Sequence, residues 1–171
     1  MIITGGIYKG RKIFAPDENI TRPTLSKVRM GVFNTLYSLI GDFGKKSFLD
    51  LFGGSGIMGI EALSRGFDSV LVFEQNSKAA QIIKKNYENL NLKPNLKIGD
   101  SLKLIDNVDL LFDVVYVDPP YYSGIYDTVF NKLSNKAKMV IAEHSENINI
   151  NNFTLIKTKN YGGKKVSFYT K

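Results

Sequence analysis

Short apolar runs alternate along the chain with longer segments whose apolar residues recur at helical spacing. The short runs are rich in β-branched and aromatic residues, which favours buried strands, and the longer segments predict amphipathic helices. The predicted strands are 47–52, 69–73, 96–98, 112–117 and 138–142, and the predicted helices are 24–40, 57–65, 77–90, 101–107 and a segment around 126–133. Because strands and helices alternate, we expect an α/β fold with a doubly wound, mostly parallel sheet.

A hairpin is expected at each end of the chain. Residues 2–4 and 12–14 are predicted as short strands around a glycine-rich, basic turn. Residues 153–158 and 165–169 are predicted as strands joined through the Asn-Tyr-Gly-Gly turn at 160–163. The C-terminal hairpin brings the expected sheet to seven strands, and the Asn-rich segment 145–152 is expected to be a loop.

The length of 171 residues fits one domain with a full core. We expect a single domain over 1–171, in which a basic N-terminal extension (1–22) precedes the main body (23–171). No stretch approaches the ~20 apolar residues of a membrane span, and the N-terminus lacks the apolar region of a signal peptide. The absence of cysteine and the single histidine argue against disulfides and a zinc site. We therefore expect a cytoplasmic protein that contacts neither membrane nor metal.

A net charge of +7 and a pI near 9.4 make the chain basic. A compact basic domain is typical of nucleic-acid binding, although lysine also serves solubility. Three basic residues of the N-terminal turn, Lys9, Arg11 and Lys12, are placed to grip phosphates. Alternatively, they protect an edge hairpin from further pairing.

The sequence FDVVYVDPPY (112–121) is a buried strand that ends in a carboxylate, two prolines and a tyrosine. Proline cannot donate to a sheet ladder, so the strand must stop at Asp118, and Pro119 and Pro120 stiffen the backbone that follows. In open α/β sheets ligands bind at the carboxyl edge. We therefore expect Asp118 and Tyr121 to belong to a site.

Three other strand ends describe an adenosine pocket. Gly53, Gly54 and Gly56 follow the first predicted strand and enter a helix, where the backbone can approach a ligand. Glu74 falls about 20 residues later, at the end of the second strand, where a carboxylate can hold ribose hydroxyls. Asp100, after the third strand, could accept from an adenine amino group or simply cap the next helix.

Among adenosine cofactors, a nicotinamide dinucleotide would use the same loop and Glu74. It would also require a sizeable substrate domain, for which the chain has no room, and it would leave DPPY unexplained. The glycines are not followed by Gly-Lys-Ser/Thr, which excludes a Walker-type phosphate loop.

Taken together, LDLFGGSGIMGIEALSRG (49–66) and DPPY (118–121) resemble class I S-adenosylmethionine-dependent methyltransferases that act on amino groups. GGIYKGRK (5–12), RPTLSKVR (22–29) and YGGKKVSFY (161–169) make the chain similar to the RsmD family, which methylates the exocyclic N2 of a guanine in small-subunit (16S) ribosomal RNA. The resemblance covers almost the whole chain. The loop reads FGGSG where the family often has FAGSG, and 145–152 matches no family motif.

This resemblance implies a class I methyltransferase fold, S-adenosylmethionine as cofactor and small-subunit rRNA as partner. The residues it assigns to the cofactor are Asp50, Gly53, Gly54, Gly56, Glu74, Asp100, Arg22 and Thr24, and Arg29 joins the N-terminal basic residues as an RNA contact. The substrate is free rRNA or a 30S particle, and the enzyme is expected to be a monomer.

Chemistry explains why an amino-methylating enzyme would use DPPY. A nucleobase amino group is a poor nucleophile because its lone pair is delocalised into the ring. Asp118 and the carbonyl of Pro119 could accept its two N–H groups and aim the lone pair at the methyl donor. Tyr121 would stack on the extruded base. Whether Asp118 also takes a proton is left open.

Besides a nicotinamide oxidoreductase, which a binding titration of S-adenosylmethionine against NAD would separate, two other functions remain possible from the sequence. One is an adenine-N6 or cytosine-N4 methyltransferase acting on DNA or another RNA, which would normally need extra target-recognition sequence. The other is a non-catalytic RNA-binding module that keeps the fold, for which a broken glycine loop or DPPY would be expected; both motifs are intact.

Overall fold

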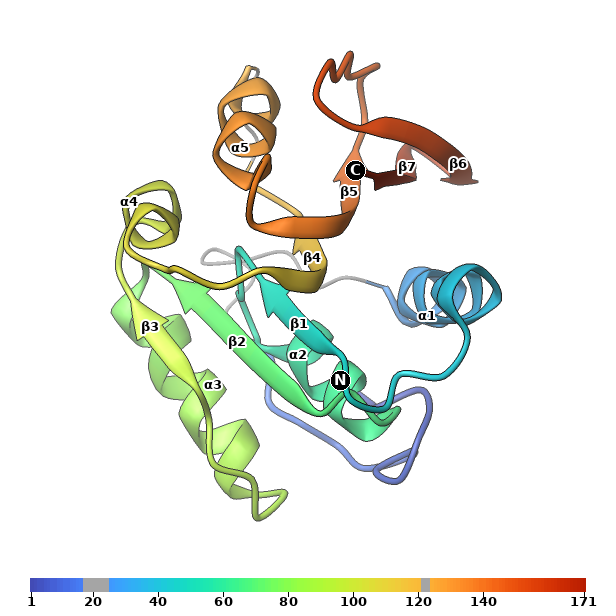
Figure 1. Cartoon of the computed structure of the whole chain (residues 1–171). Helices are drawn as coiled ribbons and strands as arrows, with labels where there is room; N and C mark the ends of the chain where they lie inside the picture. The colour runs from blue at the N-terminus through green and yellow to red at the C-terminus, as the bar shows by residue number, and fades with distance from the viewer. Residues whose placement is uncertain (17–24, 121–123) are drawn as a thin grey trace.

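The computed structural model describes residues 1–16, 25–120 and 124–171, which form one seven-stranded sheet covered by helices (Figure 1). The strands are β1 (Ser47–Asp50), β2 (Ser69–Glu74), β3 (Leu96–Ile98), β4 (Phe112–Val117), β5 (Ala137–His144), β6 (Thr154–Tyr161) and β7 (Lys164–Thr170). The helices are α1 (Ser26–Ile40), α2 (Ile57–Ser64), α3 (Ser77–Glu88), α4 (Ser101–Asp106) and α5 (Ile125–Leu133).

The strand order is β3-β2-β1-β4-β5-β7-β6. The first five strands in this order are parallel, whereas β7 lies antiparallel between β5 and β6. The prediction of a mostly parallel sheet that closes with a C-terminal hairpin is thus confirmed. Because β1, β2, β4 and β5 run in one direction, their carboxyl ends meet at one edge of the sheet, where ligands bind in folds of this kind.

Two apolar layers sandwich the sheet. On one face, alternate strand residues pack with α1, α2 and α3, as Val32, Ile60 and Ile83 illustrate. On the other face the intervening residues pack with α4 and α5, through Ile105 and Phe130. Because both faces are covered, β1, β2 and β4 read as continuous apolar runs in the sequence.

The N-terminal hairpin is shorter than predicted. It contains a single antiparallel bridge, Ile2 to Lys12, instead of two strands. Its turn packs against the C-terminal end of α2, where the N–H of Ile7 donates to the carbonyl of Ser64 at 2.8 Å. This contact with a helix, the buried side chain of Ile3 and backbone bonds across the turn, such as that from the Ile3 N–H to the Arg11 carbonyl at 3.0 Å, hold the segment.

The strand β5 is longer than predicted and reaches His144. The periodicity of KMVIA indicated only its apolar centre. Pairing with β7 carries the strand onward, because Glu143 lies opposite Val166 and His144 opposite Lys165. This extension places two polar residues at the carboxyl edge of the sheet.

Within the described residues, no helix is long and apolar enough to cross a membrane.

Candidate active site

The glycine loop and Glu74 meet at the carboxyl edge of the sheet. The Glu74 carboxylate accepts from the Gly54 N–H through Oε2 and from the Asn76 N–H through Oε1, both at 2.7 Å. Gly56, which caps α2, has φ 75°, a left-handed conformation that suits glycine. A Cβ at Gly53 would lie 2.4 Å from Cγ1 of Val72, which shows how closely the loop backbone packs on β2 in this chain. The loop is thereby held against β2, and the glycine loop and Glu74, two parts of the predicted adenosine pocket, are in contact.

Asp50, the last residue of β1, is a buried carboxylic acid at the carboxyl edge of the sheet. Its side chain is 1% exposed, and neither carboxylate oxygen has a hydrogen-bond partner among the described residues. Burial raises the pKa of Asp50 to about 7, and the negative charges of Glu74 and Asp118 raise it in the same direction, against nearby backbone N–H groups of Gly59 and Phe52. A buried polar group without a partner is costly, and three neighbouring carboxylates favour a cationic ligand.

Asp118 follows β4 and lies beside Lys164, the first residue of β7. The distance from Lys164 Nζ to Asp118 Oδ2 is 3.6 Å, and the same ammonium forms an ion pair with Glu143 Oε2 at 2.6 Å. Glu143 is 1% exposed and also accepts from the hydroxyl of Tyr116. A buried carboxylate on β5 thus fixes a lysine next to the predicted catalytic carboxylate.

A cavity of about 660 Å³ opens on the Asp118 side of this edge. Its residues come from the start of α1, the 118–120 segment, the start of α5, the loop after β5 and the β6–β7 turn. They are Leu25, Val28, Asp118, Pro119, Pro120, Gly124, Tyr126, Asp127, Glu143, His144, Ser145, Glu146, Asn147, Ile148, Asn149, Tyr161, Gly163 and Lys164. None of the predicted adenosine residues lines it. The cavity is therefore distinct from the predicted adenosine residues, and Asp118 is the strand-end carboxylate that lines it.

Asp100 caps α4, as the alternative interpretation had it. Its Oδ1 accepts from the N–H groups of Leu102 at 2.8 Å and Lys103 at 3.4 Å. Gly99, before it, is joined by its N–H to the carbonyl of Glu74 at 3.0 Å. Asp100 thus lies at the same edge as Glu74, and its contact with adenine stays a prediction.

The prediction that Arg29 contacts RNA needs correction. Its side chain is 1% exposed and forms an ion pair through Nε with Glu61 Oε1 at 3.2 Å. Its Nη2 also donates to the carbonyl of Ile2 at 2.6 Å and to Ser26 Oγ at 3.1 Å. Arg29 is a core ion-pair residue, because the fold closes the N-terminal segment and α2 over it.

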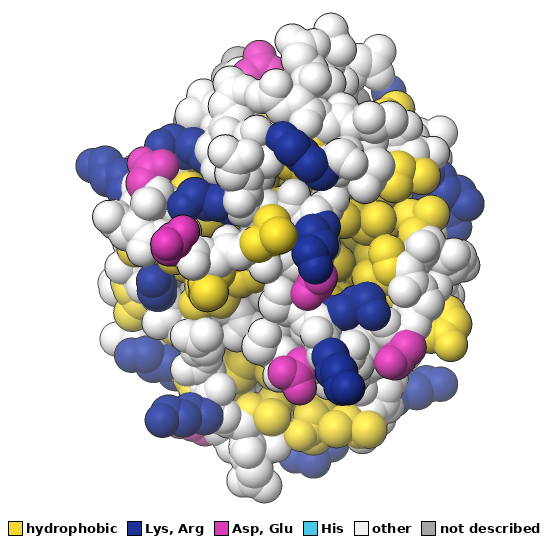
Figure 2. All heavy atoms as spheres, in the orientation of Figure 1, with side chains coloured by type: hydrophobic (Ala, Val, Ile, Leu, Met, Phe, Trp, Pro, Cys, Tyr) yellow, Lys and Arg dark blue, Asp and Glu magenta, His cyan; other side chains and the backbone are white. Residues whose placement is uncertain are grey.

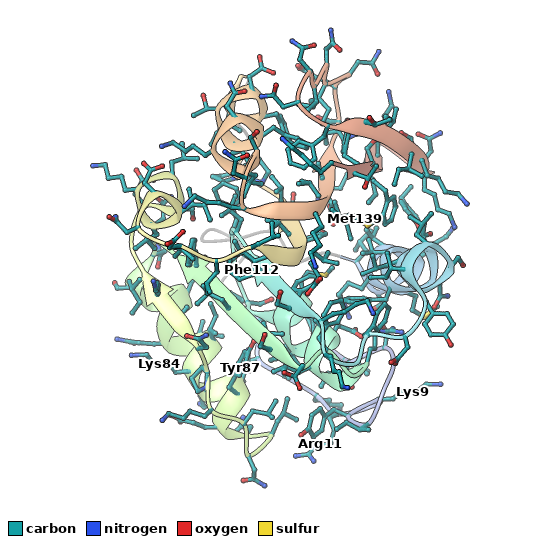
Figure 3. All side chains as sticks on the ribbon, viewed as in Figure 1. Lys9, Arg11, Lys84, Tyr87, Phe112 and Met139 are labelled. Carbon is teal, nitrogen blue, oxygen red and sulfur yellow. The ribbon has the colours of Figure 1, made fainter. Side chains whose placement is uncertain are left out.

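The other predicted RNA residues, Lys9, Arg11 and Lys12, are exposed. They belong to the segment that packs at the C-terminal end of α2, and Arg11 donates to the carbonyl of Asn89, beyond the end of α3, at 2.9 Å. Figure 3 places Lys9 and Arg11 at the bottom of the view, with the β6–β7 hairpin at the upper right. Whether they contact RNA stays a prediction.

Three predicted residues, Arg22, Thr24 and Tyr121, lie outside the described residues. Conversely, two residues of the site, Glu143 and Lys164, were not predicted from the sequence. The available signal was a Glu-His pair after an apolar strand and a doubled lysine in YGGKKV. Neither shows in sequence which strand it would neighbour, because that depends on β7 inserting beside β5.

Comparison with known proteins places this geometry in a family. The family model described as conserved hypothetical protein 95 matches residues 1–170. Ribosomal RNA small subunit methyltransferase D of Haemophilus influenzae is 32% identical over 174 residues, which cover 94% of this chain and 88% of that protein.

Solved structures agree. The Escherichia coli protein yhhF is 25% identical, with a TM-score of 0.86 over 99% of this chain and 97% of its own. The more distant SMU.776, solved in complex with SAH, is 14% identical, with a TM-score of 0.62 over 85% of this chain and 49% of its own, and shows the fold alone. The sheet has the class I methyltransferase fold. The sequence match and the fold together assign the chain to the ribosomal RNA small subunit methyltransferase D (RsmD) family.

Proposed function

We propose that this protein transfers a methyl group from S-adenosylmethionine to the exocyclic N2 of a guanine in small-subunit ribosomal RNA. The observation that carries the proposal is the position of Asp118 and Pro119, which line a cavity at the carboxyl edge of the sheet, the edge that also carries the glycine loop held by Glu74. The name of the Haemophilus influenzae relative supports rRNA as the substrate class. The guanine comes from the family resemblance of the sequence.

The residues at the strand ends fit S-adenosylmethionine. The cofactor carries two cationic groups, an ammonium and a sulfonium. Glu74 and Asp118 lie close enough to Asp50 to raise its pKa, so three carboxyl groups gather where a cation could bind. Asp50 has no partner of its own among the described residues, so a cationic group would satisfy it. Glu74 keeps acceptor capacity for ribose hydroxyls, since each oxygen can accept more than one hydrogen bond. When bound, the cofactor supplies an electrophilic methyl group.

On the cavity side, Asp118 and the carbonyl of Pro119 accept the two N–H groups of the target amine. Two acceptors hold the nitrogen so that its lone pair faces the donor, and they stabilise the positive charge that develops on it. Lys164, held by buried Glu143, positions the Asp118 carboxylate. Tyr121 supplies a stacking surface, by the sequence prediction alone.

The whole chain acts as one catalytic unit in this proposal, with 23–171 as the catalytic core and 1–22 as an extension. The bridge from Ile2 to Lys12 and the contact of Ile7 with α2 support the extension as part of the same body. We propose that the protein acts as a monomer in the cytoplasm, on rRNA or on an assembling 30S particle.

The test is Asp118→Ala, with incorporation of labelled methyl groups into RNA as the measurement. We expect turnover to fall by at least about 10³-fold, because the oriented acceptor is lost, while the Kd for S-adenosylmethionine changes less than about threefold. Wild-type turnover in the variant would remove Asp118 from the mechanism.

Mapping the product base settles the substrate. Undermethylated small-subunit particles and free rRNA are incubated separately with labelled S-adenosylmethionine, and the modified nucleotide is identified. Label at adenine N6 or cytosine N4 would favour the alternative adenine-N6 or cytosine-N4 methyltransferase. Label on DNA or protein alone would overturn the proposal.

A further inference from the structure

The two ends of the chain are equally basic in sequence. Residues 147–171 contain five lysines and no acidic residue, and residues 1–16 contain Lys9, Arg11 and Lys12 and again no acidic residue. On the face shown in Figure 2, by contrast, basic and acidic side chains are interspersed. A substrate as acidic as RNA could therefore be held by either end, and only position can distinguish them.

The ends lie at opposite edges of the sheet. Because β7 runs antiparallel to β5, its first residues lie beside the last residues of β5, with Lys165 opposite His144. The β6–β7 turn is thus at the carboxyl edge, where Tyr161, Gly163 and Lys164 line the cavity. The N-terminal turn instead contacts Ser64 at the C-terminal end of α2, which returns from the carboxyl edge to the opposite one.

The hairpin also packs against α1. The space that a Cβ of Gly31 would need is filled by the Tyr161 hydroxyl, which lies 1.8 Å from that position. Lys27 precedes Gly31 by four residues and so projects from the same side of the helix. On β6, Lys159 and Lys157 share the face of Tyr161, because side chains alternate along a strand. Three lysines therefore border the seam between α1 and the hairpin, which leads to the cavity.

These lysines are available to a ligand. Lys27 and Lys157 are exposed and Lys159 is half-buried. None of the three forms an ion pair within the part of the chain that the structure describes. Lysines on an edge strand also prevent unwanted pairing, which would account for the two on β6. That reason does not extend to Lys27, which lies on a helix.

We propose that Lys27, Lys157 and Lys159, the seam lysines, form the surface that binds the RNA backbone on either side of the target base. This inference rests on the proposed RNA methyl transfer and deepens it. The seam lysines contact phosphates, while the cavity takes the extruded base. Lys9, Arg11 and Lys12, at the other edge, contribute only general attraction.

A matched pair of triple variants tests the proposal. Lys27→Gln/Lys157→Gln/Lys159→Gln and Lys9→Gln/Arg11→Gln/Lys12→Gln each lower the net charge from +7 to +4. Binding of a single-stranded fragment of small-subunit rRNA is measured as a function of salt. Each lost phosphate contact removes about 0.7 from the slope of log K against log salt. We expect a decrease of about 2 for the seam triple, with binding about 10–100-fold weaker, and little change for the N-terminal triple.

Each outcome has one meaning. An equal or larger loss in the N-terminal triple overturns the surface, because net charge or the other edge then governs binding. If the seam triple unfolds, the single variant Lys157→Gln replaces it, with an expected decrease in slope of about 0.7. A wild-type protein that binds S-adenosylmethionine but methylates no RNA would contradict the proposed function itself, irrespective of either triple.

Discussion

Glu61 and Asp50 are two carboxylates buried to nearly the same extent, at 0% and 1% exposure. They differ in the hydrogen-bond and ion-pair partners that the fold supplies to them. Glu61 on α2 accepts from the N–H and hydroxyl of Thr4, both at 2.7 Å, and pairs with Arg29 and Arg65, both at 3.2 Å. Asp50, at the end of β1, has no hydrogen-bond partner among the described residues.

The difference separates scaffold from site. A buried charge is tolerated when its partners are part of the fold, as at Glu61, where the N-terminal segment, α1 and α2 converge. A buried carboxyl without partners costs stability, and such a cost persists where a ligand supplies the missing interaction. Glu143 lies between the two cases, because Lys164 and Tyr116 satisfy it while its lysine also faces Asp118.

The largest expected effect breaks the satisfied carboxylate. Glu61→Gln leaves the buried Arg29 guanidinium without its charge partner, so the free energy of unfolding should fall by about 3–5 kcal/mol in urea denaturation. As a control, Lys138→Gln removes the exposed pair with Asp113 and should cost less than about 1 kcal/mol. Similar losses in both variants would mean that burial of the Glu61 pairs does not matter.

A smaller effect, of opposite sign, is expected at Asp50. The pKa of Asp50 is about 7 in the folded protein and about 3.8 in the unfolded chain. Between these pH values the folded state binds a proton that the unfolded state has lost. Wild-type stability therefore falls as the pH rises from about 4 to 7. Asn cannot ionise, so it avoids this loss. The stability advantage of Asp50→Asn over wild type should therefore grow by about 2–3 kcal/mol from pH 5 to pH 8, measured by urea denaturation.

The same variant tests the ligand. Affinity of the wild type for S-adenosylmethionine should rise as pH passes through 7, because a cation favours the ionised carboxylate, and calorimetric titration should find that Asp50→Asn binds about tenfold more weakly. If Asp50→Asn bound S-adenosylmethionine as tightly as the wild type at pH 8, Asp50 would not contribute to cofactor binding.

A last effect, on the rate and not on stability or cofactor binding, is expected at Lys164, which in the proposed mechanism positions Asp118. Lys164→Gln should lower kcat for RNA methylation about tenfold, with unchanged Kd for S-adenosylmethionine, and Lys164→Arg should recover part of the rate because a cation is restored. Loss of cofactor affinity without loss of kcat would place Lys164 outside the Asp118 site.

Local chemistry allowed much of this edge to be anticipated. Pro119 and Pro120 stop a strand wherever it lies, and glycines after an apolar strand open a helix with exposed N–H groups, so DPPY and the loop at 53–56 could be placed on the sheet from the sequence alone. The contact between Gly54 and Glu74 follows from β1 and β2 being parallel neighbours.

What the sequence determined about this protein was its alternation of elements, the strand ends that carry chemistry, and the resemblance to one family. The tertiary structure alone decided that Arg29 is buried on Glu61, that β7 brings Lys164 to Glu143, and that the two basic ends lie at opposite edges. The reason is physical. Strand ends and turns depend on near neighbours in the chain, whereas burial and ion pairing depend on contacts such as those between positions 29 and 61 or 143 and 164, which form only when the sheet and its helices pack.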